Sequence, residues 1–293
     1  MQNDVLKSGS SASPSVPNRA DAFPLADAAT WPGGITISPE PVRRVHTRSR
    51  RRNTSLIYST LPLGMRVSES QSETRFLKVV QLEPRATVVR AQPVWLRVLE
   101  EGRMRRRAPD FAVVIDGRAE LHETKQDAEC RKPDVISELL SIRDEVERHP
   151  GWRYSVTLES ALLAEPLRSN TDLLWRELVP DEEIDLDLRL RTSSILDDGP
   201  ITAIELIERT TSGRDHQNAR GSWENLLAMI AGRLVDFDVS KFLTLESLLW
   251  NRNSGPPRRR TLPFGSVEDA IRSPLIDRRP AVFCGLQIRR SST

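Results

Sequence analysis

Cysteine and long hydrophobic runs are both scarce in this sequence. Cys130 and Cys284 are its two cysteines, too few for a disulfide framework or a cysteine-built metal centre. No apolar run approaches the roughly 18 residues that cross a bilayer, and the mean hydropathy is −0.43. The residues up to Gly34 lack the basic and then apolar order of an export signal. These absences predict a cytoplasmic protein in a reducing compartment, without a membrane partner.

Lysine is also rare, because five of the 43 basic residues are lysine and the rest are arginine. The formal net charge of +2 conceals arginine clusters at 43–52, 103–107 and 258–260. The planar arginine fork fits phosphate oxygens, so the clusters predict contact with a polyanion such as nucleic acid. The general preference for arginine needs no functional cause, since a GC-rich genome encodes basic residues mainly as arginine.

Composition divides the chain into four regions. Residues 1–55 are rich first in Ser, Pro, Ala and Gly and then in Arg, which predicts a disordered and basic N-terminal arm. Residues 56–165 carry the patterns of a folded α/β domain, and residues 166–250 those of a smaller helical domain. A Pro- and Arg-rich tail, 251–293, follows.

The α/β domain shows helix and strand signals in a definite order. An apolar helical face ends at Pro84, and two hairpins are predicted with turns at Glu-Gly, 101–102, and Asp-Gly, 116–117. An amphipathic helix covers 133–149, and the strand WRYSVTLE begins at Trp152. Helix, strands, helix and strand in this order predict a sheet covered by helices.

The helical domain is predicted from two amphipathic segments, about 201–209 and 221–233, followed by short strands. This order is typical of a winged helix-turn-helix module. Basic residues are few on its second helix, with Arg220 and Arg233 only at the edges, whereas a reader of the DNA major groove carries more. We therefore expect this module to dock a protein. Residues 160–199 are expected to connect the domains.

Residues 108–126, APDFAVVIDGRAELHETKQ, place charged side chains on a half-buried hairpin. Side chains alternate along a strand, so Glu123 and Lys125 share one face and Thr124 points to the other. The Asp-Gly turn brings Asp110 of the preceding strand near that face. Buried charges must be paired or bind metal, and two carboxylates with a backbone carbonyl suit Mg²⁺. The lysine would orient an attacking water and offset phosphate charge.

Pro-Asp, twelve intervening residues and Glu-x-Lys form the signature of the PD-(D/E)xK nuclease superfamily. Residues 68–177 also resemble the TnsA family, the endonuclease subunit of heteromeric transposases. The matching segments, in the family's order and at about its spacing, are SETRFLKVVQLEP, VVRAQPVWL, RRRAPDFAVVIDG, ELHETKQDAE and GWRYSVTLES. Residues 200–250 are more loosely similar to that family's helical, winged-helix-like domain.

The resemblance implies a restriction-endonuclease-like fold, a mixed sheet flanked by helices, followed by a smaller winged-helix-like α domain. Residues 56–165 would then form the PD-(D/E)xK endonuclease domain. The positions that match the family's catalytic residues are Glu73, Asp110 and Lys125, and Glu123 supplies a second metal ligand. The implied metal set is Asp110, Glu123, the Thr124 carbonyl and Glu73, which either binds the metal or positions the water. Mg²⁺ is the implied cofactor, with Mn²⁺ as a substitute.

By the same resemblance, the chain would cut the 5′ strand at transposon ends during cut-and-paste transposition. Its implied partners are the DNA ends, an RNase H-like transposase subunit that cuts and joins the 3′ strand, and an AAA+ ATPase regulator of transposition. The implied location is the bacterial cytoplasm, at the nucleoid when DNA is bound. The arginines expected to hold the DNA backbone are Arg103, Arg105, Arg106, Arg107, Arg50, Arg51 and Arg52.

The candidate site residues also have purely structural explanations. Ser70-x-x-Glu73 fits a helix capping box, and Glu69 competes with Glu73 for the acidic position on the helix. Glu123 and Lys125 could form an exposed cross-strand charge pair.

Two other functions are compatible with the same sequence. One is a stand-alone PD-(D/E)xK nuclease of restriction or repair, against which neighbouring reading frames for a transposase and an ATPase would count. The other is a DNA-binding regulator that uses the helix-turn-helix module, with the hairpin carboxylates inert.

Overall fold

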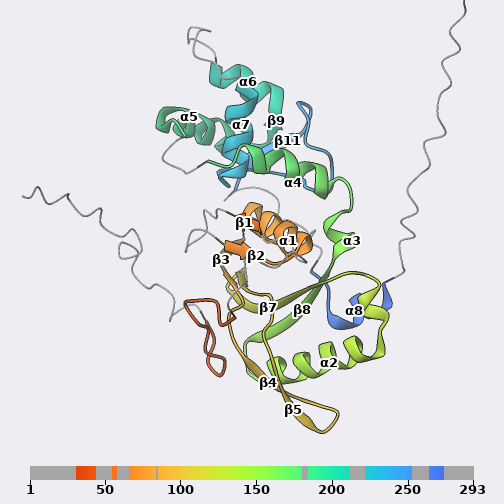
Figure 1. Ribbon diagram of the computed structural model, residues 1–293. Helices are drawn as coiled ribbons and strands as arrows, with labels where there is room; N and C mark the ends of the chain where they lie inside the picture. The colour runs from red at the N-terminus through yellow and green to blue at the C-terminus, as the bar shows by residue number, and fades with distance from the viewer. Residues whose placement is uncertain are drawn as a thin grey trace, which may run out of the picture.

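The computed structural model describes residues 31–43, 55–57, 66–83, 85–179, 184–211, 222–252 and 264–273 (Figure 1). These residues form a mixed α/β structure in which a four-stranded sheet is flanked by helices, with a helical region beside it. In the ranges described, no helix is both long and apolar enough to cross a membrane. Arg50, Arg51, Arg52 and the cluster at 258–260 lie outside the described residues.

The central sheet has the strand order β3 (Ala86–Ala91), β6 (Phe111–Ile115), β7 (Arg118–Lys125) and β8 (Trp152–Leu158). The first three strands are antiparallel and β8 runs parallel to β7, so the sheet is mixed. The tight β6–β7 turn has Asp116 at φ 51° and Gly117 at φ 71°, a left-handed conformation that Asp and Gly tolerate well. The hairpin predicted at this turn is confirmed.

Helices cover both faces of the sheet, as the sequence predicted. α1 (Gln71–Leu82) packs Phe76 on the face that includes Phe111, and α2 (Pro133–Glu147) packs Leu139 on the opposite face. A parallel strand needs a long crossover, and α2 supplies it between β7 and β8. Figure 1 shows α1 and α2 on opposite sides of these strands.

Two small antiparallel ribbons and a 3₁₀ turn complete this domain. They are β1 (Ser55–Ile57) with β2 (Arg66–Ser68), β4 (Leu96–Glu100) with β5 (Arg103–Arg107), and the turn η2 (Glu129–Arg131). Leu96 and Val98 of β4 are buried in the core cluster that α2 covers. The predicted β4–β5 hairpin is confirmed, with Glu101 and Gly102 at its turn.

Residues 31–43 fold against the sheet domain, which corrects the expectation of a disordered arm for this part of 1–55. Trp31 stacks on Trp152 with ring centroids 5.6 Å apart, and Ile35 is buried in the core cluster beside α2. The composition of this segment could not predict that outcome, because its anchoring contacts are with strands and helices far along the chain.

After β8, α3 (Glu159–Leu162) still packs Leu162 in the core beside α1. The helical region that follows contains α4 (Leu167–Arg176), α5 (Leu186–Asp197), α6 (Ala203–Thr211), α7 (Ser222–Ala231) and a small sheet of β10 (Val235–Phe237), β11 (Leu248–Asn251) and β9 (Ile201–Thr202). The helices predicted near 201–209 and 221–233 correspond to α6 and α7. Residues 160–199, expected to be a connection, instead contain α3, α4 and α5, because Leu174 and Leu196 join the core of this region.

Residues 264–273 return to the sheet domain, which corrects the expectation of a tail for this part of 251–293. α8 (Val267–Arg272) packs beside α2 and β8, and Gly265 forms a β-bridge with Val156. The preceding Pro- and Arg-rich residues dominated the sequence pattern, so this short apolar return was missed.

Candidate active site

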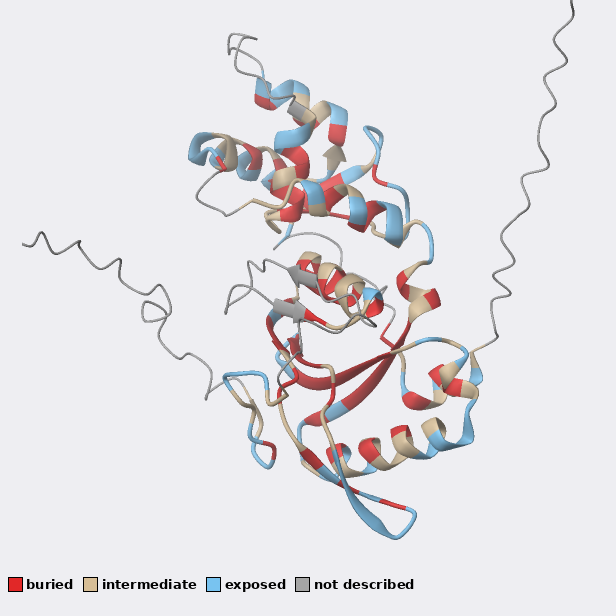
Figure 2. Ribbon diagram, in the orientation of Figure 1, coloured by how far each residue is buried: buried red, intermediate tan, exposed pale blue. Residues whose placement is uncertain are grey.

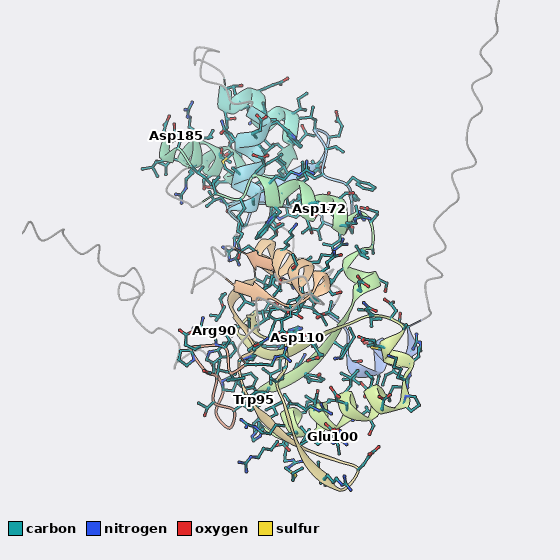
Figure 3. The ribbon with its side chains drawn as sticks, viewed as in Figure 1. Arg90, Trp95, Glu100, Asp110, Asp172 and Asp185 are labelled. Carbon is teal, nitrogen blue, oxygen red and sulfur yellow. The ribbon has the colours of Figure 1, made fainter. Side chains whose placement is uncertain are left out.

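The predicted site residues meet at one edge of the central sheet. Asp110 immediately precedes β6, and Glu123, Thr124 and Lys125 end β7, so the antiparallel register sets Asp110 beside them. Glu73 lies in the first turn of α1, which covers this edge. Figure 3 shows Asp110 below α1, near the middle of the sheet domain.

Asp110 is fixed by Thr124, one residue beyond the position opposite it in the β6–β7 register. Its Oδ2 accepts hydrogen bonds from the Thr124 amide at 2.8 Å and from the Thr124 hydroxyl at 2.9 Å. Burial raises the pKa of Asp110, although these two hydrogen bonds and the charge of Lys125 act in the opposite direction. Thr124 therefore orients the carboxyl through its amide and hydroxyl, in addition to the carbonyl role predicted from the sequence.

Glu123 and Lys125 form a close and largely buried ion pair. Lys125 Nζ lies 2.7 Å from Glu123 Oε1, and the two side chains are 18% and 11% exposed, respectively. Burial and the neighbouring Asp110 raise the pKa of Glu123 to about 8. Burial lowers the pKa of Lys125, but the attraction of Glu123 outweighs it and the net shift is upward. The alternative of an exposed cross-strand pair is therefore wrong.

Glu73 makes the helix-capping contacts that the sequence allowed and also lies near Asp110. Its backbone amide donates to Ser70 Oγ at 3.1 Å, which caps the helix, and its Oε2 accepts from the Glu69 amide at 2.7 Å. Burial and the charge of Asp110 raise the pKa of Glu73 to about 7. The carboxyl thus stabilises the start of α1, and the charge of Asp110 favours its protonated form.

Glu69 has a different environment from Glu73. Its Oε2 lies 2.5 Å from Arg43 Nη2. The side-chain amide of Gln92 is hydrogen-bonded to Glu69 in one orientation and to Arg43 in the flipped orientation. The backbone amide of Gln92 donates to the backbone carbonyl of Asp110 at 2.7 Å. Sequence reasoning missed Arg43 as a neighbour of the site, although it begins the arginine cluster at 43–52 together with Arg44.

The arginines predicted to bind DNA differ in whether they form ion pairs with carboxylates of the same chain. Arg107 donates to both oxygens of Glu100 at 2.7 Å and lies 2.9 Å from Glu138. Arg105 lies 3.4 Å from Glu100. Arg103 and Arg106 are exposed.

The donor chemistry of the site fits a hard divalent cation. Asp110, Glu123 and Glu73 present carboxylate oxygens, and each has a pKa raised in part by burial. A cation would relieve the mutual repulsion of these groups once they are ionised. Over the described part of the chain, however, no three such side chains already form a metal cluster.

The four residues predicted to be catalytic, Glu73, Asp110, Glu123 and Lys125, are thus neighbours in a single electrostatic cluster. The cluster brings together a helix terminus and two adjacent strands. No known family model matches the chain, and a search of curated proteins gave no match either. What this site does must therefore be inferred from its own chemistry.

Proposed function

We propose that this chain is a metal-dependent DNA endonuclease of the PD-(D/E)xK superfamily. The observation that carries the proposal is the cluster at the end of the β6–β7 hairpin. Two carboxyl groups and a lysine from the predicted motif share this edge with Glu73 of α1. A sheet that served only as a scaffold would hold apolar side chains here, because buried carboxylates are costly.

The residues of the cluster have complementary chemical roles. Asp110, Glu123 and the Thr124 carbonyl would hold Mg²⁺, which supplies Lewis-acid stabilisation of charge on the phosphate. Lys125, whose pKa is raised above its ordinary value, would donate a hydrogen bond to a phosphate oxygen or to the attacking water. Glu73, with a pKa of about 7, is suited to accept a proton near neutral pH.

The topology supports the finer fold assignment that we propose. α1, the antiparallel strands β3, β6 and β7, the crossover helix α2 and the parallel strand β8 follow the order expected of a restriction-endonuclease-like domain. The helices α6 and α7 with the three-stranded sheet β10-β11-β9 are compatible with a winged-helix-like module.

We further propose that the chain acts as a TnsA-like subunit of a heteromeric transposase and cleaves the 5′ strand at transposon ends. The support is the resemblance of residues 68–177, whose matching segments include the helix of Glu73 and both strands of the motif. In this proposal, an RNase H-like subunit cuts the 3′ strand and an AAA+ ATPase regulates the assembly.

A strand-specific cleavage assay tests this function. The purified chain would be mixed with Mg²⁺, the transposase encoded beside it and a transposon-end duplex labelled separately on each strand. Asp110→Ala and Lys125→Ala should abolish the 5′ cuts and leave the 3′ cuts of the partner intact. Asp134→Asn, an exposed acid at the start of α2, is the matched control and should cut normally. Equal 5′ cutting by all variants would exclude the site.

A further inference from the structure

The β4–β5 hairpin has two faces with different surroundings. Along β4, Leu96, Val98 and Glu100 are buried and the intervening residues are exposed, because the inner face packs on α2. The outer face carries the two remaining cross-strand pairs, Arg97 with Arg106 and Leu99 with Met104. Figure 2 shows the exposed strand of this hairpin projecting from the sheet domain.

Two of the inner-face arginines form ion pairs within the protein, whereas the outer-face arginines do not within the described ranges. Glu100 holds Arg107 and Arg105. Within the described ranges, Arg97 and Arg106 have no carboxylate partner, and the Arg106 guanidinium lies 4.7 Å from the centroid of the Trp95 ring. Like charges directly opposite each other destabilise a ribbon. This arginine pair therefore favours an anionic partner that would neutralise both charges.

An apolar pair lies at the tip of the same face. Leu99 and Met104 are each 63% exposed and are directly opposite one another, next to the turn. They contribute little to the core at that exposure. Apolar side chains flanked by arginines are the means by which several DNA-binding proteins enter the minor groove and separate adjacent base pairs.

The base of the hairpin adjoins the candidate active site. Trp95 Nε1 donates to the Val42 carbonyl at 3.1 Å, and the Val42 amide donates to the Gln92 carbonyl at 3.0 Å. The amide of Gln92 is in turn bonded to the Asp110 carbonyl. Figure 3 shows Trp95 between Asp110 and the hairpin residue Glu100. The base of the hairpin is therefore linked to Asp110 through a short chain of hydrogen bonds.

We propose that the outer face of the β4–β5 hairpin is a DNA-binding ribbon. Arg97 and Arg106 bind phosphates of duplex DNA, and Leu99 and Met104 enter its minor groove, unstack a base step and bend the duplex. The inference rests on the proposed nuclease function, since it supplies the means by which that site would hold its substrate.

The phosphate contacts are tested by the salt dependence of binding. All proteins carry Asp110→Ala, which prevents cleavage, and fluorescence anisotropy follows a labelled duplex of about 25 base pairs. Adding Arg97→Ala and Arg106→Ala should weaken binding and reduce the slope of log affinity against log salt by about 1.8. The matched control is Arg118→Ala with Arg153→Ala, two exposed strand arginines at the opposite end of the sheet, which should leave the slope unchanged.

The insertion of Leu99 and Met104 into the minor groove is tested by energy transfer between dyes at the two duplex ends. The Asp110→Ala parent should increase the transfer by a bend on the order of 20–90°, and Leu99→Ala with Met104→Ala should abolish this increase while keeping the salt slope. The matched control is Leu186→Ala with Leu190→Ala, which are 65% and 63% exposed on α5. It should bend DNA as the parent does.

The outcomes separate this inference from the function on which it rests. A parent that does not bind duplex DNA would contradict the nuclease proposal itself. Binding and bending that are unchanged in both hairpin variants would overturn the ribbon alone. Loss of association with the transposase subunit, together with normal DNA binding and bending, would identify the face as a protein contact and would also overturn it.

Discussion

Thr124 illustrates how one side chain can decide the geometry of the whole site. Both its amide and its hydroxyl bond the same oxygen of Asp110, at 2.8 and 2.9 Å. Both Thr124 groups therefore act on a single oxygen of the Asp110 carboxyl. The motif letters Glu-x-Lys treat this central position as variable, so the hydroxyl contact could not be predicted from the sequence pattern.

The pH dependence of stability follows from Glu123. Its pKa is about 8 in the folded protein against an ordinary value of 4.5. Between these two pH values, Glu123 is protonated in the folded protein and ionised in the unfolded chain. The extra stability is complete below pH 4.5 and is lost as the pH rises through about 8. The free energy of unfolding should therefore fall with rising pH in this window, by at most about 1.4 kcal/mol per pH unit from this group.

Urea unfolding at several pH values within this window measures the effect. Glu123→Gln keeps the shape of the side chain and should flatten the pH dependence. The contributions of Glu73 and Asp110, whose pKa values are also raised, would remain. Mg²⁺ should increase the stability of the natural chain most at the alkaline end, where the carboxylates are ionised. An identical pH slope in both proteins would contradict the burial of a titrating Glu123.

At the scale of elements, local sequence signals predicted the helices and the hairpin whose own residues supply the cap, the turn or the apolar face. Ser70 and the apolar face predicted α1, the Asp116-Gly117 turn predicted the β6–β7 hairpin, and Pro133 marked the start of α2. The segments at 31–43 and 264–273 were misassigned, because their stability comes from distant partners such as Trp152 rather than from periodicity.

Phe264 provides a direct test of the element that the sequence missed. Its ring lies 5.2 Å from the Phe76 centroid and 4.8 Å from that of His122, and the residue is 9% exposed. Phe264→Ala should lower the free energy of unfolding by about 3 kcal/mol, the usual cost of removing a buried aromatic ring. Phe242→Ala, at a position 56% exposed, is the control and should change it little. Denaturant titration measures both, and equal effects would contradict the packing of this segment.

At the scale of the whole molecule, α1 belongs to both domains. One side packs on the sheet, and the other contacts α4, with Lys78 lying 3.5 Å from Asp172. Arg233, just after α7, donates to the Glu83 carbonyl at 2.7 Å and also to the Ala86 carbonyl. A guanidinium at this end also complements the helix dipole. The helix that carries Glu73 at its start is therefore held at its end by the helical region.

We expect this sharing to make the two domains unfold together. Differential scanning calorimetry should show one transition for the natural chain, and Arg233→Ala should lower its midpoint, since unsatisfied carbonyls cost about 1–3 kcal/mol. Arg209→Ala, which removes an exposed pair with Glu205 on α6, should leave the midpoint nearly unchanged. Two separate transitions in the natural chain, or equal midpoints in the two variants, would show that α1 does not couple the domains.

The return of Phe264 to the sheet also has a consequence for the order of synthesis. The chain leaves the sheet domain at α3, forms the helical region and only then supplies the ring that closes over Phe76 and His122. A ribosome releases these parts in the same order, so a nascent chain cannot complete this core until α8 has emerged. Only molecules finished through α8 would therefore carry a fully packed sheet domain.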